Sequence, residues 1–259
     1  MTKKVALVTG ASSGIGREFA LQLAAQGYTI IAVARRREQL QILLDEMPGD
    51  DHRFELADLA DPEQVACIAD LLEQQPVDLL VNNAGYSVLE PFYQAERAAQ
   101  EKILAVNCGA VTTLAHAFLA SSKAGDALVN VASIVSYLPT PAQPVYSATK
   151  AYISAFSECL WHEHRNRDVY VMGLCPGLTQ TEFISSATGG DNDDDNLPAM
   201  MIQTATEVVD EAMLALSKRK KSIIVTGRAN RMMLWMNRLL SRHRLVKVLG
   251  FIGDPERVL

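Results

Sequence analysis

The chain alternates short apolar runs with longer helical patterns along most of its length, and this alternation restricts the folds it can adopt. Continuously apolar strands separated by helices are typical of a parallel sheet that is covered on both faces. Since such crossovers are right-handed, we expect an α/β fold, a doubly wound parallel sheet of about seven strands. The predicted strands are VALVT (5–9), TIIAVA (29–34), HRFEL (52–56), VDLLVN (77–82), DALVNVAS (126–133), VYVMGLC (169–175) and SIIVTG (222–227).

Helical patterns fill the intervals between these strands, near residues 15–26, 36–46, 62–74, 96–122, 145–166 and 205–218. Two of the helix starts carry capping signals. Asp61 precedes a first-turn proline, and Thr204 and Glu207 have the spacing of a capping box. Because no repeat or linker interrupts the chain, we expect a single domain over residues 1–259.

Composition argues against several classes of partner. The 24 Lys and Arg against 30 Asp and Glu give a formal charge of −6, which lacks the positive field that nonspecific nucleic-acid binding requires. The start MTKKVALVTG contains no secretory signal, and no apolar run approaches the ~18 residues of a membrane span. Four scattered cysteines without C-x-x-C pairs favour neither a metal site nor disulfides. We therefore expect a cytoplasmic protein without a metal.

The first strand runs directly into TGASSGIG (9–16) and then a helix, the context in which a glycine motif binds a dinucleotide. Gly10 permits a tight turn, Gly14 lets the backbone approach a pyrophosphate, and Gly16 allows close helix packing. An ordinary strand-to-helix turn is the alternative. The predicted cofactor site also includes Ser12, Ser13 and Ile15.

The end of the second strand bears on which dinucleotide binds. A cofactor with a free ribose 2′-hydroxyl usually meets an acidic residue there, whereas this chain reads AVARRREQL. Arg35 and Arg36 instead offer guanidinium groups suited to a 2′-phosphate. A solvated basic start to a surface helix is the alternative. The sequence thus favours NADP(H) over NAD(H).

Polar residues also follow the third and fourth strands, where doubly wound sheets bind ligands. In ADL (57–59) Asp58 can accept a bond from an adenine amino group, and Leu59 adjoins it. NNAG (82–85) can line the ribose. Each motif alone is equally compatible with turn chemistry. The residues of NNAG assigned to the cofactor are Asn83, Ala84 and Gly85.

The segment YSATK (146–150) places a phenol and an amine one helical turn apart, on the same face. A phenol has a pKa of about 10, so acid–base work near neutral pH requires a lower value. The ammonium of Lys150, together with a cationic nicotinamide, would favour the phenolate of Tyr146. Ser133 ends the fifth strand, where its hydroxyl can hold a substrate oxygen opposite Tyr146.

Taken together, TGASSGIG, NNAG, Asn107, Ser133, YSATK and PG (176–177) resemble, in order and spacing, the short-chain dehydrogenase/reductase family. The resemblance covers roughly residues 5–227. It implies a Rossmann-type fold and hydride transfer between a nicotinamide and a carbonyl or alcohol. It also implies that the catalytic residues are Asn107, Ser133, Tyr146 and Lys150.

Further roles follow from the resemblance. Lys150 would bond the nicotinamide ribose, and Asn107 would organise a water linked to Lys150. For Asn107 alone, a satisfied core amide is the alternative. Thr181 falls where the family uses a hydroxyl to hold the nicotinamide carboxamide, after the turn at Pro176 and Gly177.

Two segments extend beyond the resemblance. Residues 185–202 are rich in glycine and acid and then turn apolar, which indicates either a substrate lid or a solvated linker. In the C-terminal helical extension, 228–259, Met, Leu and Trp recur at helical spacing, with several Arg and Lys and no acid from Arg228 to Lys247. The extension is either a helix on anionic lipid or a helical hairpin that completes a pocket or subunit contact.

These features predict NADPH-dependent reduction of a carbonyl, with Tyr146 as proton donor. Because the C-terminal extension resembles those of family members that reduce steroid or long-chain carbonyl compounds, the resemblance implies a hydrophobic ketone as the substrate. One alternative is an NADP-linked alcohol dehydrogenase acting in the oxidative direction, since the residues do not fix the direction. A second alternative is a non-catalytic dinucleotide-binding protein at a lipid surface. The resemblance also implies a homodimer or homotetramer that pairs through the helices at 96–122 and 145–166.

Overall fold

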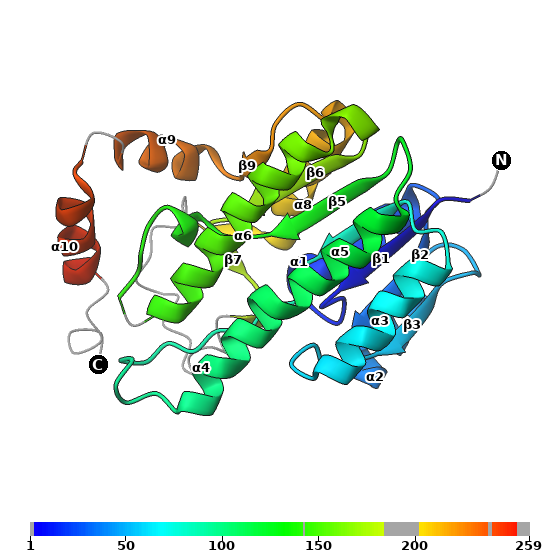
Figure 1. The fold of residues 1–259 in the computed structure, drawn as a ribbon, viewed down its shortest axis with the longest axis horizontal. Helices are drawn as coiled ribbons and strands as arrows, with labels where there is room; N and C mark the ends of the chain where they lie inside the picture. Colours follow the sequence, from blue (N-terminus) through cyan, green and yellow to red (C-terminus); the bar gives the residue numbers. More distant parts are fainter. Residues whose placement is uncertain (1–2, 142, 184–201, 238–239, 253–259) are drawn as a thin grey trace.

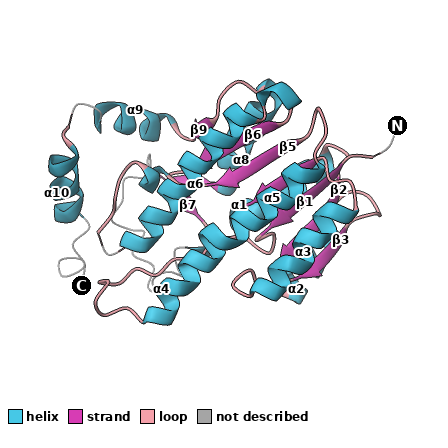
Figure 2. Ribbon diagram, viewed as in Figure 1, coloured by secondary structure: helices cyan, strands magenta, loops and turns pink. Residues whose placement is uncertain are grey.

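The central element is a parallel sheet of seven strands in the order β3-β2-β1-β4-β5-β6-β9 (Figures 1 and 2). The computed structural model describes residues 3–141, 143–183, 202–237 and 240–252. Each of the seven apolar runs forms one strand of this sheet, so the predicted fold class is confirmed. The strands are β1 (Val5–Thr9), β2 (Thr29–Ala34), β3 (Arg53–Leu56), β4 (Leu79–Asn82), β5 (Ala127–Val131), β6 (Tyr170–Cys175) and β9 (Ile223–Val225).

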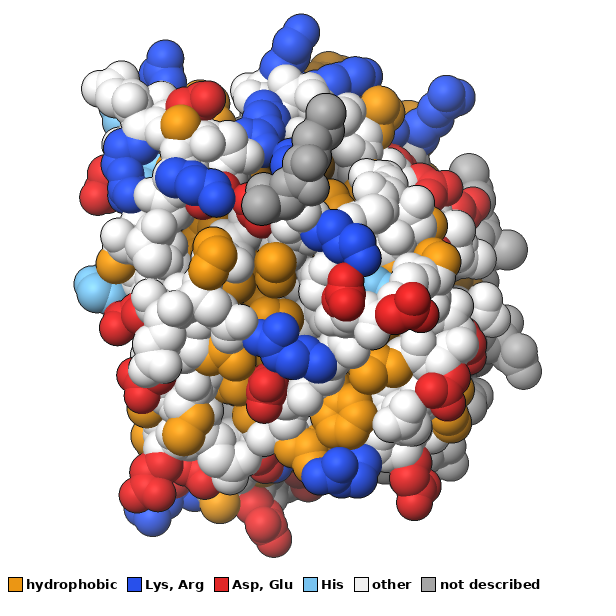
Figure 3. All heavy atoms as spheres, turned by 90° about the vertical axis from the view of Figure 1, so that its right-hand side faces the viewer, with side chains coloured by type: hydrophobic (Ala, Val, Ile, Leu, Met, Phe, Trp, Pro, Cys, Tyr) orange, Lys and Arg blue, Asp and Glu red, His pale blue; other side chains and the backbone are white. Residues whose placement is uncertain are grey.

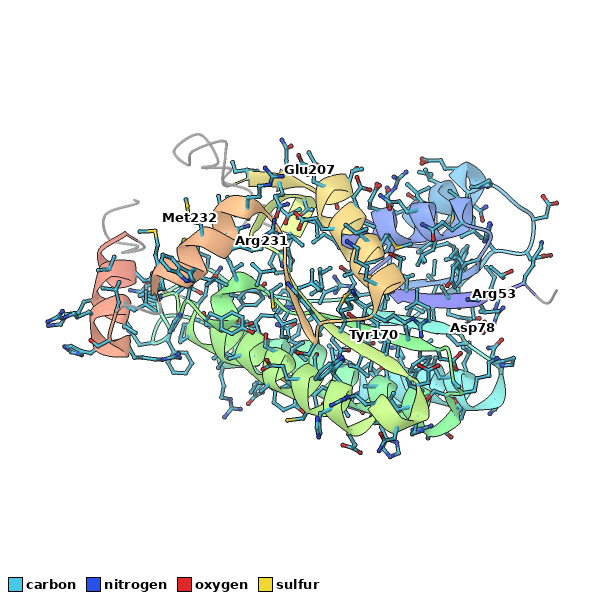
Figure 4. The ribbon with its side chains drawn as sticks, turned by 90° about the horizontal axis from the view of Figure 1, so that it is seen from above. Arg53, Asp78, Tyr170, Glu207, Arg231 and Met232 are labelled. Atoms are coloured by element: carbon cyan, nitrogen blue, oxygen red, sulfur yellow. The ribbon has the colours of Figure 1, made fainter. Side chains whose placement is uncertain are left out.

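Helices cover both faces of the sheet, and α6 and α8 lie on opposite sides of it in Figure 4. One face packs against α1 (Gly14–Ala25), α2 (Arg37–Glu46) and α8 (Ala205–Lys218). The other packs against α3 (Pro62–Gln74), α5 (Val111–Ser121) and α6 (Pro144–Glu163). Phe19 is fully buried in the first layer and Phe118 nearly so in the second. These two layers give the strands the all-apolar character seen in the sequence.

The strand order reverses at β1, which pairs with β2 on one side and β4 on the other. In open parallel sheets, such a switch point leaves a crevice at the carboxyl ends of the strands, where ligands bind. The glycine turn follows β1 and the NNAG segment follows β4. The topology therefore places these two motifs together.

A buried polar chain joins the neighbouring strands β4 and β5 to α6. Asn82 Nδ2 donates to Asn130 Oδ1 at 3.0 Å, and Asn130 Nδ2 donates to Ser157 Oγ at 3.1 Å. Ser157 Oγ in turn donates to the carbonyl of Ile153 at 2.7 Å. Because unpaired polar groups in a core are unfavourable, these bonds fix the register of β4, β5 and α6.

The helix predicted over 96–122 is confirmed, since Arg97–Ser121 is helical throughout, but a π-helical turn inside it was not predicted. The structure has α4 (Arg97–Leu104), a π-helical turn (Ala105–Ala110) and then α5. Arg97–Ser121 is long and apolar enough to cross a membrane by length and composition, but 56% of its most apolar window is buried inside the protein. Since it packs against α3 and α6, it is a core helix.

Both predicted helix caps are confirmed. The side chain of Asp61 accepts a hydrogen bond from the Glu63 N–H at 2.9 Å. Thr204 and Glu207 form a reciprocal capping box, with Thr204 N donating to Glu207 Oε2 at 2.9 Å and Glu207 N donating to Thr204 Oγ1 at 3.1 Å. These bonds satisfy amide groups that would otherwise lack partners in the first turn.

A second, two-stranded parallel sheet was not expected from the sequence. It pairs β7 (Leu178–Gln180) with β8 (Ile202–Thr204), in register at Thr179 and Gln203. The strands bracket the predicted substrate lid, residues 185–202. That lid lies outside the described residues except for Ile202, which belongs to β8.

The C-terminal extension forms α9 (Arg228–Asn237) and α10 (Arg242–Ile252), which agrees with the helical expectation and projects from one end of the molecule (Figure 1). Arg231 anchors α9 through an ion pair with Glu211 at 2.6 Å. Leu245 of α10 is buried.

At the amino ends of the strands, acidic and basic side chains are interspersed (Figure 3).

Candidate active site

The glycine turn after β1 requires the absence of side chains. Gly10 and Gly14 have φ values of +65° and +54°, which favour glycine. A Cβ on Gly16 would collide with the carbonyl of Gly10 and the side chain of Asn83. The turn leads into α1, which has no acidic residue in its first turn. The turn and the start of α1 therefore fit a dinucleotide phosphate.

Thr9, which the sequence analysis did not single out, ties the glycine turn to the loop after β4. Its hydroxyl accepts hydrogen bonds from Asn83 N at 2.9 Å and Ala84 N at 3.0 Å. Asn83 Nδ2 returns a bond to the carbonyl of Thr9 at 2.9 Å. The sequence signal that could have identified Thr9 is a hydroxyl residue at the last position of a central, buried strand. These bonds hold the two loops in one geometry.

Arg36 folds back onto the glycine turn. Its Nε and Nη2 lie 3.3 and 3.2 Å from Ser12 Oγ, and its Nη1 donates to Glu182 Oε2 at 2.9 Å. Arg35 turns the other way, with Nη1 3.7 Å from Asp58 Oδ2. Both predicted arginines thus lie at the end of β2 beside the glycine turn and the loop after β3.

The other predicted cofactor residues differ in what their side chains contact. The side chains of Ile15 and Leu59 pack into the two hydrophobic layers, on opposite faces of the sheet. Asp58 keeps its carboxylate at the surface, where Oδ1 accepts from the Ala60 N–H at 3.0 Å. Ser13 precedes α1 with extended backbone, and its side chain makes no capping bond.

Tyr146 and Lys150 share one face of α6, as predicted. Lys150 Nζ lies 5.6 Å from the centroid of the Tyr146 ring and donates to the Val131 carbonyl at 2.8 Å. Ser133 follows β5, and its Oγ accepts from the Val135 N–H at 3.3 Å. Both Tyr146 and Lys150 are buried.

The expectation that Lys150 and a bound nicotinamide favour the phenolate of Tyr146 stays a prediction, because it concerns the complex with the oxidised cofactor. Burial raises the pKa of the phenol above its ordinary value of about 10, and a hydrogen bond with Ser133 offsets this only in part. Burial also lowers the pKa of Lys150 to about 8, while Cys175 and Cys108 act in the opposite direction. For both groups, the loss of hydration on burial therefore changes the pKa more than the neighbouring side chains do.

Asn107 lies in the π-helical turn, a kind of irregularity that is frequent at functional sites. Its amide group is fully bonded: Oδ1 accepts from Tyr86 N at 2.9 Å, and Nδ2 donates to Tyr86 O at 3.0 Å and to Thr149 Oγ1 at 3.1 Å. A Cβ built on Gly85 would lie 3.6 Å from Lys150 Nζ and 3.7 Å from Asn107 Oδ1. Asn107 and Lys150 thus face the same space.

The turn after β6 brings a further segment over the site. Pro176 accepts a hydrogen bond from the Ile134 N–H at 2.9 Å, and a Cβ on Gly177 would collide with the Asn230 side chain of α9. Thr181 lies against the glycine turn, with Cγ2 2.9 Å from a Cβ built on Gly14. Phe183, not predicted, tilts against Tyr146 with ring centroids 5.8 Å apart.

All the predicted site residues lie at or just beyond the carboxyl ends of β1 to β6, or on the helices beside them. The arrangement combines a glycine turn that fits a phosphate with a buried phenol and a buried amine. Within the described ranges, no group of three or more His, Cys, Asp or Glu residues could hold a metal ion.

Comparison with known proteins gives a family match and close structural neighbours. The family model described as short chain dehydrogenase matches residues 4–191. The sulfoacetaldehyde reductase of Chromohalobacter salexigens is 35% identical over 191 residues, which cover 71% of this chain and 76% of that protein.

Two solved structures extend the similarity over more of the chain. A short-chain dehydrogenase from Sphingobium yanoikuyae in complex with NADPH has a TM-score of 0.77 at 30% identity, covering 86% of this chain and 87% of that one. The bulky-bulky ketone specific alcohol dehydrogenase from Comamonas testosteroni has a TM-score of 0.74 at 25% identity, covering 92% and 94%.

We predict that Lys150→Met stabilises the protein at pH 7 and that this advantage shrinks as pH rises. The fall of the Lys150 pKa from 10.5 to about 8 means that the unfolded state holds a proton which the folded state releases between these values. Wild-type stability therefore rises across that window, by about 3 kcal/mol, whereas the Met variant has no such gain. The Met variant also loses the hydrogen bond from Lys150 to the Val131 carbonyl, which lowers its free energy of unfolding by about 1 kcal/mol.

Urea denaturation at pH 7 and pH 10.5 measures this difference. Lys150→Met is expected to be about 2 kcal/mol more stable than wild type at pH 7 and about 1 kcal/mol less stable at pH 10.5. Lys218→Met, on the exposed end of α8, is the matched control and should show no such trend. An advantage that is independent of pH would contradict the role given to burial.

Proposed function

The chain belongs to the short-chain dehydrogenase/reductase family, oxidoreductases that bind a nicotinamide dinucleotide and act on CH–OH or C=O groups, and from this we propose that it is an NADPH-dependent carbonyl reductase. The observation that carries the proposal is the buried pair of Tyr146 and Lys150, whose ring centroid and Nζ are 5.6 Å apart. The pair lies beside the glycine turn, because Phe183 contacts Tyr146 and Thr181 contacts Gly14.

The preference for NADP(H) is supported by the residues around Arg36. A 2′-phosphate requires cationic or neutral donors, and the end of β2 offers Arg35, Arg36 and the hydroxyl of Ser12. The Sphingobium yanoikuyae relative was solved with NADPH, which supports the same choice. We assign the 2′-phosphate chiefly to Arg36, because it already contacts the glycine turn.

In the proposed mechanism, the bound cofactor supplies the hydride. Ser133 donates a hydrogen bond to the carbonyl oxygen and holds it opposite Tyr146. Tyr146 then gives its phenolic proton to the alkoxide oxygen, so that one ketone, one NADPH and one proton become one alcohol and one NADP⁺. The ammonium of Lys150 stabilises the phenolate that remains.

Asn107 acts through other residues in this scheme. Its amide holds the backbone of Tyr86, and its bond to Thr149 reaches the Tyr146 carbonyl, which accepts from Thr149 Oγ1 at 2.8 Å. Asn107 therefore positions the loop after β4 against α6.

The residues of the site do not fix the direction of the reaction. In reduction the phenol of Tyr146 acts as the acid, and burial, which raises its pKa, keeps it protonated at neutral pH. The oxidative direction would need the same group as a base. An NADP-linked alcohol dehydrogenase stays the alternative enzyme, since a bound nicotinamide cation would favour the phenolate.

We propose a hydrophobic ketone as the substrate. Phe183 covers the Tyr146 ring, which gives the reacting group an apolar neighbour. The Comamonas testosteroni relative is named for bulky ketones, which agrees with this class. The sulfoacetaldehyde reductase relative carries the name of a small anionic aldehyde, so a panel of carbonyl compounds has to include both classes.

We also propose that two copies pair through α4, the π-helical turn and α6. Leu104 and Tyr152 are exposed large side chains on this surface, and Tyr152 stacks on Phe156 with ring centroids 5.6 Å apart. Light scattering after gel filtration gives the mass. A monomer would remove this proposal.

A second candidate property is contact with an anionic membrane through α9 and α10. Met232, Trp235 and Met236 lie at helical spacing and are 60, 64 and 55% exposed. Met232 is on the outer side of α9 in Figure 4. The described part of the extension carries Arg and Lys but no acidic residue. Apolar side chains with basic neighbours suit a headgroup layer that contains anionic lipid.

We predict that Tyr146→Phe lowers the turnover of ketone reduction by about 10²- to 10⁴-fold, because no other group replaces the proton donor. The affinity for NADPH, measured by fluorescence titration, should hardly change. Tyr93→Phe, in the loop before α4 and 80% exposed, is the control and should keep full turnover. Normal turnover in Tyr146→Phe would refute the mechanism.

We predict that Arg36→Ala raises the Michaelis constant for NADPH by about 10- to 100-fold, as expected for losing charge-assisted bonds. Arg35→Ala should have a smaller effect, and the constant for NADH should change little in both variants. Arg37→Ala removes a cation that stacks on Phe54 instead and serves as the control. Equal effects on NADPH and NADH would contradict the cofactor preference.

We predict that the protein co-sediments with vesicles that contain phosphatidylglycerol and not with pure phosphatidylcholine vesicles. The double substitution Trp235→Ser and Met236→Ser should reduce the bound fraction at least about fivefold, because it removes the apolar anchor. Leu214→Ser, an exposed apolar residue of α8, is the control. Equal sedimentation of all three proteins would exclude this membrane contact.

A further inference from the structure

Three consecutive residues reach three separate parts of the proposed dinucleotide site. Thr181 lies against Gly14 of the glycine turn, and Phe183 lies against Tyr146. Between them, Glu182 extends to Arg36 and accepts a hydrogen bond from Nη1 at 2.9 Å. The segment after β7 therefore connects the pyrophosphate turn, the end of β2 and the candidate proton donor.

The contact between Glu182 and Arg36 involves the same donors that a 2′-phosphate would need. Arg36 directs Nε and Nη2 at Ser12 Oγ, and Nη2 also lies 3.3 Å from the Ser12 carbonyl. The remaining nitrogen, Nη1, is engaged by the Glu182 carboxylate. Carboxylates and phosphates bind guanidinium groups through the same fork of N–H donors.

We propose that Glu182 competes with the cofactor 2′-phosphate for Arg36 and so limits how strongly the protein discriminates NADP(H) from NAD(H). The inference rests on the proposed NADP(H) preference. A cofactor with the 2′-phosphate must break the pair between Glu182 and Arg36, and it also meets the negative charge of Glu182. A cofactor with a free 2′-hydroxyl leaves the pair intact. Glu182 is thus a specificity residue that acts through Arg36.

The size of the effect follows from the exposure of the pair. The side chains of Arg36 and Glu182 are 46% and 61% exposed, so water and salt screen their attraction. Solvated pairs of this kind shift an equilibrium by about two- to fivefold. Removing Glu182 should therefore tighten NADPH binding by about that factor.

Fluorescence titration of the full-length protein with NADPH and with NADH tests the proposal without depending on turnover. The variants are Glu182→Gln, Arg36→Gln and the two combined. Glu38→Gln serves as the matched control, because it also removes one negative charge. Glu38 lies in the exposed first turn of α2, whereas the contacts of the Arg36 side chain are to Ser12 and Glu182. Thermal melting of each variant establishes that it is folded.

Glu182→Gln should lower the Kd for NADPH about two- to fivefold and leave the Kd for NADH unchanged. It should have no effect in the Arg36→Gln background, and Glu38→Gln should change neither Kd. A neutral result for Glu182→Gln, or an equal gain for NADPH and NADH, overturns the proposal.

Failure of the underlying cofactor preference has a different signature. In that case wild type binds both cofactors equally, and Arg36→Gln changes neither Kd, which removes the Glu182 proposal as well. A second pattern refutes only the role of Glu182. In that pattern wild type prefers NADPH, Arg36→Gln abolishes the preference, and Glu182→Gln leaves the Kd for NADPH unchanged.

Discussion

The bonds between the end of β1 and the loop after β4 fix the geometry on which the candidate site depends. Thr9 accepts from two consecutive backbone amides of that loop, and the Asn83 side chain bonds back across the switch point. Gly16 leaves the space that this close approach requires. Because the sheet is rigid and buried on both faces, these hydrogen bonds hold the glycine turn and the loop after β4 in a fixed position relative to each other.

Burial dominates the electrostatics at the other side of the crevice. Tyr146 and Lys150 are both removed from water, and their pKa values move in the directions that favour neutral groups. The phenol therefore keeps its proton at neutral pH, and the amine loses its charge more readily than an ordinary lysine. Burial of the Lys150 charge is unfavourable for stability at neutral pH, a common compromise at functional sites.

Sequence patterns predicted the sheet well because each central strand is a distinct β-branched run between turn signals. They predicted the π-helical turn poorly, since VNCGA carries no propensity signal for an extra residue in a helical turn. β7 and β8 have three residues each, too few for a periodic pattern. Spacing alone placed Tyr146 and Lys150 together, but it could not show that burial raises the phenol pKa, because desolvation depends on tertiary packing. Phe183 and Glu182 lacked a motif, and only the fold brought them to the site. The assigned roles and the cofactor preference are still predictions.

The π-helical turn at Ala105–Ala110 has an implication for how this architecture diversifies. A turn of this kind holds one residue more than an α-turn, and one residue corresponds to a rotation of about 100° around the axis. Deletion of one residue there would rotate Asn107 relative to α5 and break its bonds with Tyr86. The glycine turn lies on a separate element, so such a change in length would act first on the opposite side of the crevice.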